Sequence, residues 1–265
     1  MNAPRPVAVL MYHAIEPAGV DSDADPHYSV TPAAFAAQLD AFAALGRRVR
    51  SVRDLLDEAE AGSVAGDAVA LTFDDGHASN GAAADTLAAR GASADFFVNP
   101  GLVGGPHRLS WAALRDLAAA GMSVQSHGHT HAYLDGMDAT GVRDSLERSK
   151  AAIEDALGRP VTLFAPPGGR LHPALAGTAT RLGYRALCTS RPGRWVTAAA
   201  AGLAEVPRLA VLAGTGDEAI RRWALADPWS IGRVRLRAGA LDAMKRLLGN
   251  DRYERLRGAA LGRLT

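Results

Sequence analysis

Short apolar runs alternate with amphipathic segments along the first 212 residues of the chain. The runs have the length of β-strands, and the segments between them repeat apolar residues at intervals of three or four, as helices do. Strands are predicted over residues 7–12, 68–73, 93–98, 122–127, 161–165, 184–189 and 205–211. Alternating strands and helices indicate βα units, which assemble into a parallel sheet or barrel of the α/β class.

Several helical segments carry start and stop signals as well as periodicity. Thr31 and Pro32 offer an N-cap and a proline in the first turn, and the apolar repeat that follows ends at Gly46. Further helices are predicted over residues 79–90, 111–120, 140–157 and 173–182, and glycines follow the ends of several.

After about residue 212 the alternation stops. Helices are predicted over 217–226, 239–248 and 250–262, with apolar side chains on one face and arginines on the other. We therefore divide the chain into a barrel of residues 1–212 and an α-helical C-terminal extension of residues 213–265, packed on the barrel or appended to it. The arginines favour a solvated helix face; a surface that contacts a membrane or a partner is the alternative.

Composition narrows the classes of function. The 265 residues carry a net charge of +1, which gives no reason to expect nucleic-acid binding. Charge is uneven, however, because residues 216–265 hold 11 basic and 6 acidic side chains. Cys188 is the single cysteine, so an intrachain disulfide is excluded, and its apolar neighbours indicate a buried residue rather than a nucleophile.

Apolar runs along the chain are too short for membrane insertion. The run that follows Met1–Pro6 is shorter than a signal-peptide core, and no run reaches the roughly 18 residues expected of a transmembrane helix. We expect a cytoplasmic protein, with peripheral contact to the inner membrane face through the basic C-terminal helices as a further hypothesis.

Candidate chemistry follows the ends of the predicted strands. The strand 68–73 leads directly into Asp74 and Asp75, two adjacent carboxylates that a bound cation would stabilise. His127 and His131 follow the predicted strand residues Met122–Gln125, and His13 follows the first strand. The carboxyl ends of barrel strands meet on one face, where active sites lie.

Two imidazoles and a carboxylate form a ligand set that leaves coordination positions open for water. Such a set predicts a catalytic divalent metal, with Zn²⁺ as the first choice and Co²⁺, Ni²⁺, Fe²⁺ or Mn²⁺ as further candidates. Taken singly, the motifs have ordinary explanations: Asp-Asp-Gly can be a turn or helix cap, two histidines four residues apart can be surface residues, and Pro166–Gly169 can be a plain loop. Their order along the chain favours the metal site.

These residues make the chain resemble the polysaccharide deacetylases, the NodB-homology family of carbohydrate esterases. Thr72–Gly76 matches the first motif of that family, and His127–His131 matches the second, with Gly128 where Ser or Thr is usual. The resemblance covers residues 6–211 and implies a distorted (β/α) barrel, here of about seven strands, and metal-dependent removal of N-acetyl groups from sugars.

The resemblance also implies a role for individual residues. Asp74 corresponds to the general base, and Asp75, His127 and His131 correspond to the metal ligands, with His129 outside the ligand set. The backbone N–H of Gly168, in the third motif, corresponds to the oxyanion donor.

Two departures from the commonest pattern point to one branch of the family. Ala165 stands where many members have an arginine that holds the catalytic aspartate, and Val206–Leu209 stands near the expected place of a missing Leu-x-His motif. Met11-Tyr12-His13 and Phe164-Ala165 resemble the poly-N-acetylglucosamine deacetylases, where this first-strand histidine supplies the acid. His13 is therefore our candidate acid, and a structural histidine bonded to a loop carbonyl is the alternative.

Two further side chains are weaker candidates for substrate contact. Arg170 either binds substrate, steadies Asp74 in place of the missing arginine, or is a plain surface residue; Trp111 either packs in the core or carries a sugar ring. The expected partner is an N-acetylated glycan or a lipid-linked glycan precursor. A catalytically silent carbohydrate-binding relative, and a deformylase or cyclic amide hydrolase with the same metal site, remain alternatives.

Overall fold

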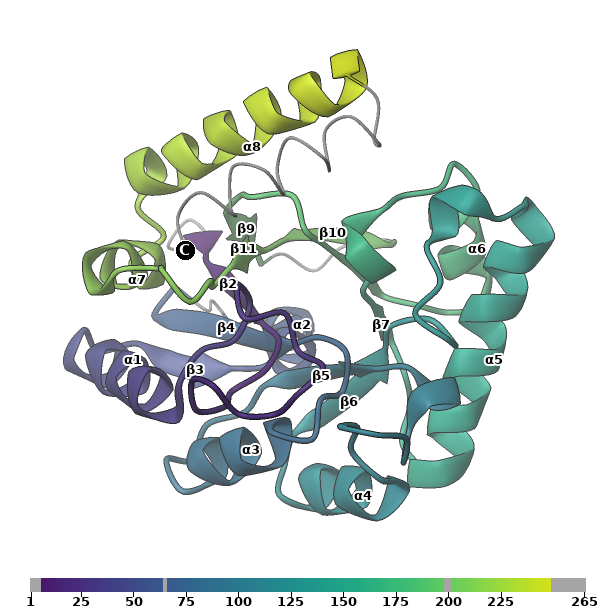
Figure 1. The fold of residues 1–265 in the computed structure, drawn as a ribbon, viewed down its shortest axis with the longest axis horizontal. Helices are drawn as coiled ribbons and strands as arrows, with labels where there is room; N and C mark the ends of the chain where they lie inside the picture. The colour runs from purple at the N-terminus through teal and green to yellow at the C-terminus, as the bar shows by residue number, and fades with distance from the viewer. Residues whose placement is uncertain (1–5, 64–65, 198–201, 249–265) are drawn as a thin grey trace.

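The computed structural model describes residues 6–63, 66–197 and 202–248 of the chain. A curved, mainly parallel sheet lies at its centre, and helices surround it (Figure 1). The strands are β1 (Pro6–Val7), β2 (Val9–Tyr12), β3 (Arg48–Arg50), β4 (Ala68–Phe73), β5 (Asp95–Val98), β6 (Ser123–Ser126), β7 (Leu163–Phe164), β8 (Ala186–Thr189), β9 (Trp195–Val196), β10 (Ala204–Pro207) and β11 (Leu209–Ala210). The helices are α1 (Pro32–Ala44), α2 (Val52–Glu60), α3 (Asn80–Ala88), α4 (Trp111–Ala119), α5 (Ala139–Leu157), α6 (Leu175–Arg181), α7 (Asp217–Ala224) and α8 (Pro228–Leu248), with short 3₁₀ turns η1 (Pro100–Leu102), η2 (Leu134–Gly136) and η3 (Pro167–Gly169).

The sheet closes into a barrel through one interrupted strand. Neighbouring strands follow the order β10-β8-β7-β6-β5-β4-β2-β11, and a single residue, Arg208, separates β10 from β11. This chain segment thus pairs with β8 through its first half and with β2 through its second. The described residues form a distorted (β/α) barrel of seven parallel strands when β10 and β11 count as one, which confirms the predicted fold class.

Alternation along the strands separates the barrel interior from its outer surface. Val9, Ala70, Phe97, Cys188 and Val206 share one buried apolar cluster inside the barrel. Their sequence neighbours point the other way, into the larger cluster beneath the helices. Further along the strands, the next inward-pointing residues lie at the carboxyl ends, and there the barrel interior is polar.

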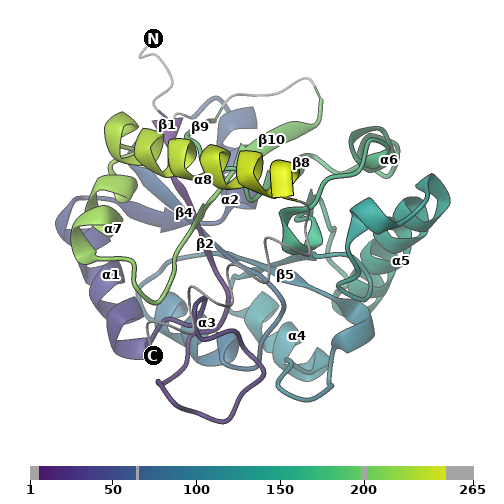
Figure 2. The same cartoon turned by 45° about the horizontal axis from the view of Figure 1, so that its top comes forward.

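The C-terminal helices pack against the barrel domain. Ile220 and Trp223 of α7 and Ile231 of α8 belong to the larger apolar cluster. Helix α7 lies beside α1, and α8 runs from α7 along the top of the molecule (Figures 1 and 2). The helix predicted over 239–248 is the second half of α8, which begins earlier, at Pro228. The helix predicted over 250–262 lies outside the described residues. Within the described part of the chain, no helix is both long and apolar enough to span a bilayer.

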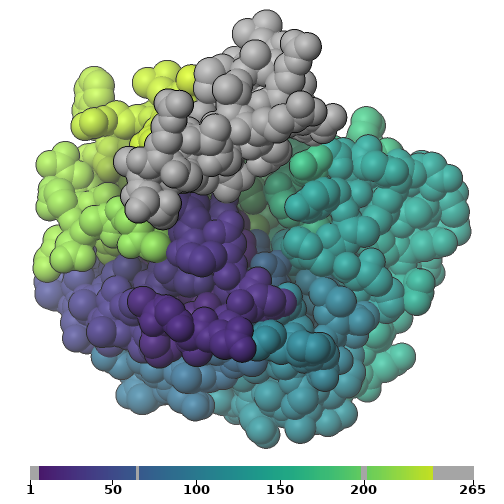
Figure 3. All heavy atoms as spheres, viewed as in Figure 1, coloured from purple at the N-terminus to yellow at the C-terminus, as the bar shows by residue number. Residues whose placement is uncertain are grey.

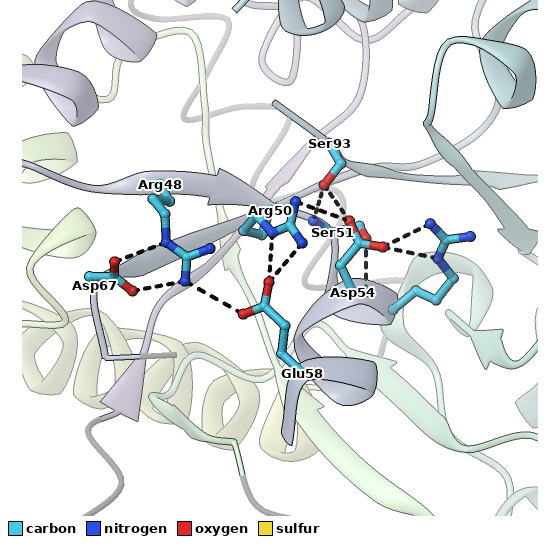
Figure 4. Close-up of polar contacts among 8 residues, drawn as sticks. Arg48, Arg50, Ser51, Asp54, Glu58, Asp67 and Ser93 are labelled. Carbon is cyan, nitrogen blue, oxygen red and sulfur yellow. Dashed lines mark hydrogen bonds and ion pairs between the residues drawn. The ribbon is translucent and has the colours of Figure 1, made fainter. Parts of the chain in front are cut away.

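The elements β3 and α2 were absent from the sequence prediction. Arg48 and Arg50 of β3 make ion pairs with Asp67 and Glu58, at 2.9 and 2.7 Å (Figure 4). Ser51 then caps α2, because its side chain accepts a hydrogen bond from the backbone N–H of Asp54 at 3.0 Å. The strand β3 has three residues and two of them are arginines, so local pattern did not reveal it.

Candidate metal centre

A polar cavity of about 540 Å³ opens at the carboxyl ends of the strands. The loop that follows β2, dark purple in Figure 3, lies across this face of the molecule. Candidate residues from four segments line the cavity: His13, Asp74, Asp75, His127, His131, Gly168 and Arg170. Most of the residues singled out in the sequence therefore lie together at one barrel mouth.

Three of these side chains form a compact cluster. Asp75 Oδ1 lies 3.2 Å from His127 Nε2 and 3.1 Å from His131 Nε2. Neighbouring ligands of a tetrahedral zinc ion are about 3.3 Å apart, given bonds of about 2.0–2.2 Å. Asp75 Oδ1 is also buried without a hydrogen-bond partner among the described residues. The donor set and its spacing fit a divalent metal without large rearrangement.

His127 is oriented by its second ring nitrogen. Its Nδ1 lies 2.8 Å from the carbonyl oxygen of Ala165, so the Nδ1–H donates there and the Nε2 lone pair faces Asp75. Asn99 secures the same turn, because its Nδ2 donates to the carbonyl of His127 at 2.5 Å. The ring is fully enclosed and its direction is fixed before any ligand arrives.

The cluster is held by strained backbone. Asp75 and His131 have φ angles of +71° and +61°, in the left-handed region that costs a non-glycine residue about 1–2 kcal/mol. Gly128, between the two histidines, has a φ of +78°, and a Cβ atom there would lie 3.3 Å from Ser145 Oγ. This crowding and the left-handed φ explain why glycine replaces the usual Ser or Thr of the motif.

Asp74 is fixed by an arginine that sequence reasoning did not assign. Arg208 Nη1 and Nη2 contact the two carboxylate oxygens of Asp74 at 2.6 and 2.9 Å, and the arginine is fully buried. Arg208 Nε and Nη1 also approach the carbonyl oxygen of Thr189 at 3.3 Å and Thr72 Oγ1 at 3.2 Å. A bidentate fork of this kind fixes both the charge and the orientation of a carboxylate.

A signal for Arg208 is present in the sequence. Residues 204, 206 and 208 share one face of the closing strand, and Val206 lies inside the barrel. Arg208 is thus an inward charge at the carboxyl end of a strand, where an inward partner such as Asp74 is needed. Alternation applied to residues 205–211 would have found it.

The two adjacent carboxylates stay ionised despite their burial. Burial raises the pKa of Asp74, but the charge of Arg208 and its hydrogen bonds outweigh this and hold the pKa below its ordinary value. Burial acts in the same way on Asp75, and its close contacts with His127 and His131 hold its pKa far below the ordinary value. Each carboxylate therefore has its own stabilising partners.

His13 lies beside this pair and packs against Tyr28, with ring centroids 4.7 Å apart. Its Nδ1 is buried and has no hydrogen-bond partner among the described residues. Burial lowers the pKa of His13, while the charges of Asp74 and Asp75 act in the opposite direction. This nitrogen therefore makes no hydrogen bond to a loop carbonyl of the described residues, which was the structural alternative for His13.

The remaining candidates occupy the rim or the core. Arg170 pairs with Asp135 at 3.1 Å and stacks on the ring of Tyr133, 4.3 Å from its centroid, whereas Asp74 is held by Arg208. Trp111 packs against the larger apolar cluster and is not among the residues that line the cavity.

Gly168 belongs to the third motif and His129 to the second. Gly168 lines the cavity with a φ of +60°, close to the ring of Tyr133. His129 Nε2 contacts Arg148 at 3.0 Å, so this histidine lies apart from the cluster of Asp75, as predicted.

Comparison with known proteins gives one family. Residues 61–187 match the model of the polysaccharide deacetylases. A putative polysaccharide deacetylase of Bacillus subtilis, YxkH, is 28% identical over 126 residues, which are 47% of this chain and 45% of that protein. The matches span less than half the length of the curated relatives.

Solved structures resemble the chain over more of its length. The deacetylase PplD of Streptococcus pyogenes, solved in complex with acetate, is 26% identical with a TM-score of 0.75, over 83% of this chain and 99% of that one. IcaB from Ammonifex degensii is 25% identical with a TM-score of 0.69, over 86% of this chain and 98% of that one. The resemblance to polysaccharide deacetylases seen in the sequence motifs is confirmed.

Proposed function

Because this chain carries a polysaccharide deacetylase domain, we propose that it is a metal-dependent hydrolase that removes N-acetyl groups from an amino sugar in a glycan or glycan precursor. The observation that carries the proposal is the spacing of 3.1–3.2 Å between Asp75 and its two histidines, directly beside a buried Asp74–Arg208 pair. A ligand set with open positions next to a second, unliganded carboxylate is the arrangement that hydrolysis by activated water requires.

A divalent ion bound to Asp75, His127 and His131 would lower the pKa of water and polarise the acetyl carbonyl. Asp74 then accepts the proton of the attacking water, and Arg208 keeps this carboxylate ionised and directed into the cavity. Imidazole and carboxylate ligands accept several first-row ions, among which Zn²⁺ is our first choice.

The leaving nitrogen must be protonated before the C–N bond breaks, since an amine anion is a poor leaving group. We assign this proton transfer to His13, which lines the cavity beside Asp74 and Asp75. The backbone N–H of Gly168 is our candidate donor to the developing oxyanion. Arg170 and the exposed ring of Tyr133 at the cavity rim are candidates for sugar contact.

Acetate release from N-acetylglucosamine oligomers tests the proposal. The metal-free protein should be inactive, and added Zn²⁺ or Co²⁺ should restore release. Asp74→Asn should abolish turnover, while Asp25→Asn, a matched change of an exposed carboxylate at the same cavity, should keep most of it. Oligomer binding without acetate release, across substrates of several lengths, would favour the silent relative; release of formate alone would favour a deformylase.

We also propose that the substrate is lipid-linked and that α8 meets the membrane surface. Trp229 and Leu236 of this helix are 82% and 76% exposed, and Arg233, Arg235 and Arg237 lie among them without an acidic residue. Vesicles with anionic lipids should sediment the protein, and Trp229→Ala should weaken this. Val20→Ala, which removes an exposed apolar side chain from the loop after β2, is the control. Equal vesicle binding by both variants, or no binding by the wild type, would contradict the proposal.

A further inference from the structure

A second group of side chains that could ligate a metal lies outside the candidate active site, and two of its members, Asp23 and His77, line the same cavity. It consists of Asp23, His77 and His107, whose ligand atoms all lie within 4.8 Å of one another. The three residues come from three different loops: the loop after β2, the loop after β4 and the loop before α4. Convergence of imidazole and carboxylate donors from separate loops is the pattern of a site that ties loops together.

His77 is buried and has hydrogen-bond partners at both ring nitrogens. Its Nδ1 lies 2.8 Å from Ser79 Oγ, and its Nε2 faces Ser22 Oγ at 3.0 Å. The backbone N–H of Ser79 donates to Nδ1 at 3.2 Å, which favours the ring proton on Nε2. An ion at Nε2 would displace the contact with Ser22 Oγ and move the ring proton to Nδ1, from which it donates to Ser79 Oγ.

The backbone around His107 holds this residue against the His77 loop. The N–H of Ala78 donates to the carbonyl of His107 at 2.9 Å, and His77 forms an antiparallel bridge with Arg108. The two imidazole rings are parallel, with centroids 6.3 Å apart. His107 has a φ of +54°, a left-handed conformation that costs a non-glycine residue about 1–2 kcal/mol. Strain of this kind is frequent where a side chain is aimed at a ligand.

Carboxylates complete the group. Asp23 Oδ1 and Glu16 Oε2 lie 3.7 and 3.8 Å from His77 Nε2. Arg108 contacts the two oxygens of Asp23, each at 2.9 Å, much as Arg208 grips Asp74. Two carboxylates and one arginine leave a net charge of −1 at this group, which favours a cation over an anion.

We propose that Asp23, His77 and His107 bind a second divalent cation, with Zn²⁺ as the preferred ion and Glu16 or water in the remaining position. Nitrogen and oxygen donors in this number suit zinc and its first-row neighbours. The ion would fasten the loop after β2 to the cavity rim. Since Asp75 and His77 are two residues apart on one loop, each directs a side chain to a different ion. This site does not depend on the proposed deacetylase activity.

Zinc stoichiometry tests the proposal directly. Metal-free protein titrated with Zn²⁺ and then desalted should retain two equivalents, as measured by mass spectrometry of the metal. His107→Ala should retain one, and Asp75→Asn should also retain one. His107→Ala combined with Asp75→Asn should retain none. His27→Ala, an exposed histidine outside both groups, is the matched control and should retain two.

Two measurements on the wild-type protein distinguish zinc bound at this group from zinc bound elsewhere on the surface, and they do not depend on the folding of a variant. Anomalous diffraction at the zinc edge from wild-type crystals should give a peak between His77 and His107. The second equivalent of Zn²⁺ should also slow amide exchange or proteolysis in the loop of residues 17–29. Retention of one equivalent by the wild type, or of two by folded His107→Ala, would overturn the proposal, as would anomalous density at the Asp75 cluster alone.

Discussion

Replacement of Arg208 gives a sharp test of the site, because one side chain governs both the stability of the barrel and the charge of Asp74. We expect Arg208→Met, which keeps a long apolar stem, to leave Asp74 buried without its ion-pair partner. Both residues are almost fully enclosed, at 0% and 3% exposed, so solvent screening is slight. Loss of one partner from a buried pair costs about 3–5 kcal/mol.

The size of the effect should depend on pH. With Arg208 in place the pKa of Asp74 lies below its ordinary value, so this carboxylate stabilises the fold above the unfolded pKa of about 4, and the contribution is lost as pH falls. Without Arg208, burial is opposed only by the neighbouring histidines, and the pKa rises. The destabilisation should therefore be large at pH 7 and smaller at pH 4.

Urea unfolding at both pH values measures this difference. A loss of about 3–5 kcal/mol corresponds to a melting temperature lower by roughly 10 °C in a protein of this size. The acid limb of acetate release should move to higher pH, since Asp74 must be ionised to accept a proton. Arg191→Met, at an exposed ion pair with Glu205, should change stability by about 0.5 kcal/mol or less. A loss below about 1 kcal/mol in Arg208→Met, independent of pH, would refute the reasoning.

Three further predictions follow from the site and the barrel interior. Burial raises the pKa of Asp95 to about 7, so its ionisation destabilises the fold progressively as pH rises from about 4 to 7. Asp95→Asn should therefore raise the urea midpoint at pH 8, by an amount equivalent to about 1 kcal/mol or more in the free energy of unfolding, and change it little at pH 4. No gain at pH 8 would contradict this. His13→Ala should lower kcat by about 10²-fold or more with the zinc content unchanged, whereas an equal loss of zinc would make His13 a support of the metal site. Gly168→Ala should lower kcat and the melting temperature, because the new Cβ would lie 2.7 Å from Tyr133 Cε1 at a φ of +60°; wild-type kinetics would show that the loop yields easily.

Much of the barrel follows from local pattern. The prediction of 68–73 as a strand matches β4 at both ends, because six consecutive buried positions are bounded by polar residues on either side. The strand β3 has only three residues, two of them arginines, and its apolar contribution is too small to produce a pattern. For α2, the buried positions Val52, Leu55, Leu56 and Ala59 do repeat at helical spacing, so this helix was within reach of the sequence.

Some residues of the candidate site could likewise be predicted from local sequence pattern, and others could not. Asp75, His127 and His131 follow directly from strands that could be recognised, and a motif then relates them to one another. Arg208 and Asp74 are 134 residues apart, and they meet because the interrupted strand β10–β11 closes the barrel beside β2. Alternation along the strand places Arg208 inside the barrel, but its pairing with Asp74 depends on closure and register, which no short segment of the sequence specifies.

The central claim is that a divalent ion held by Asp75, His127 and His131 supports hydrolysis of an acetamide with Asp74 as base. Acetate release by metal-free protein, followed as Zn²⁺ is added back, tests it most directly. We predict release that grows with occupancy of this cluster in the wild type and in His107→Ala, and none in Asp75→Asn at any zinc concentration. Equal release by metal-free and zinc-loaded protein, or undiminished release by Asp75→Asn, would contradict the account.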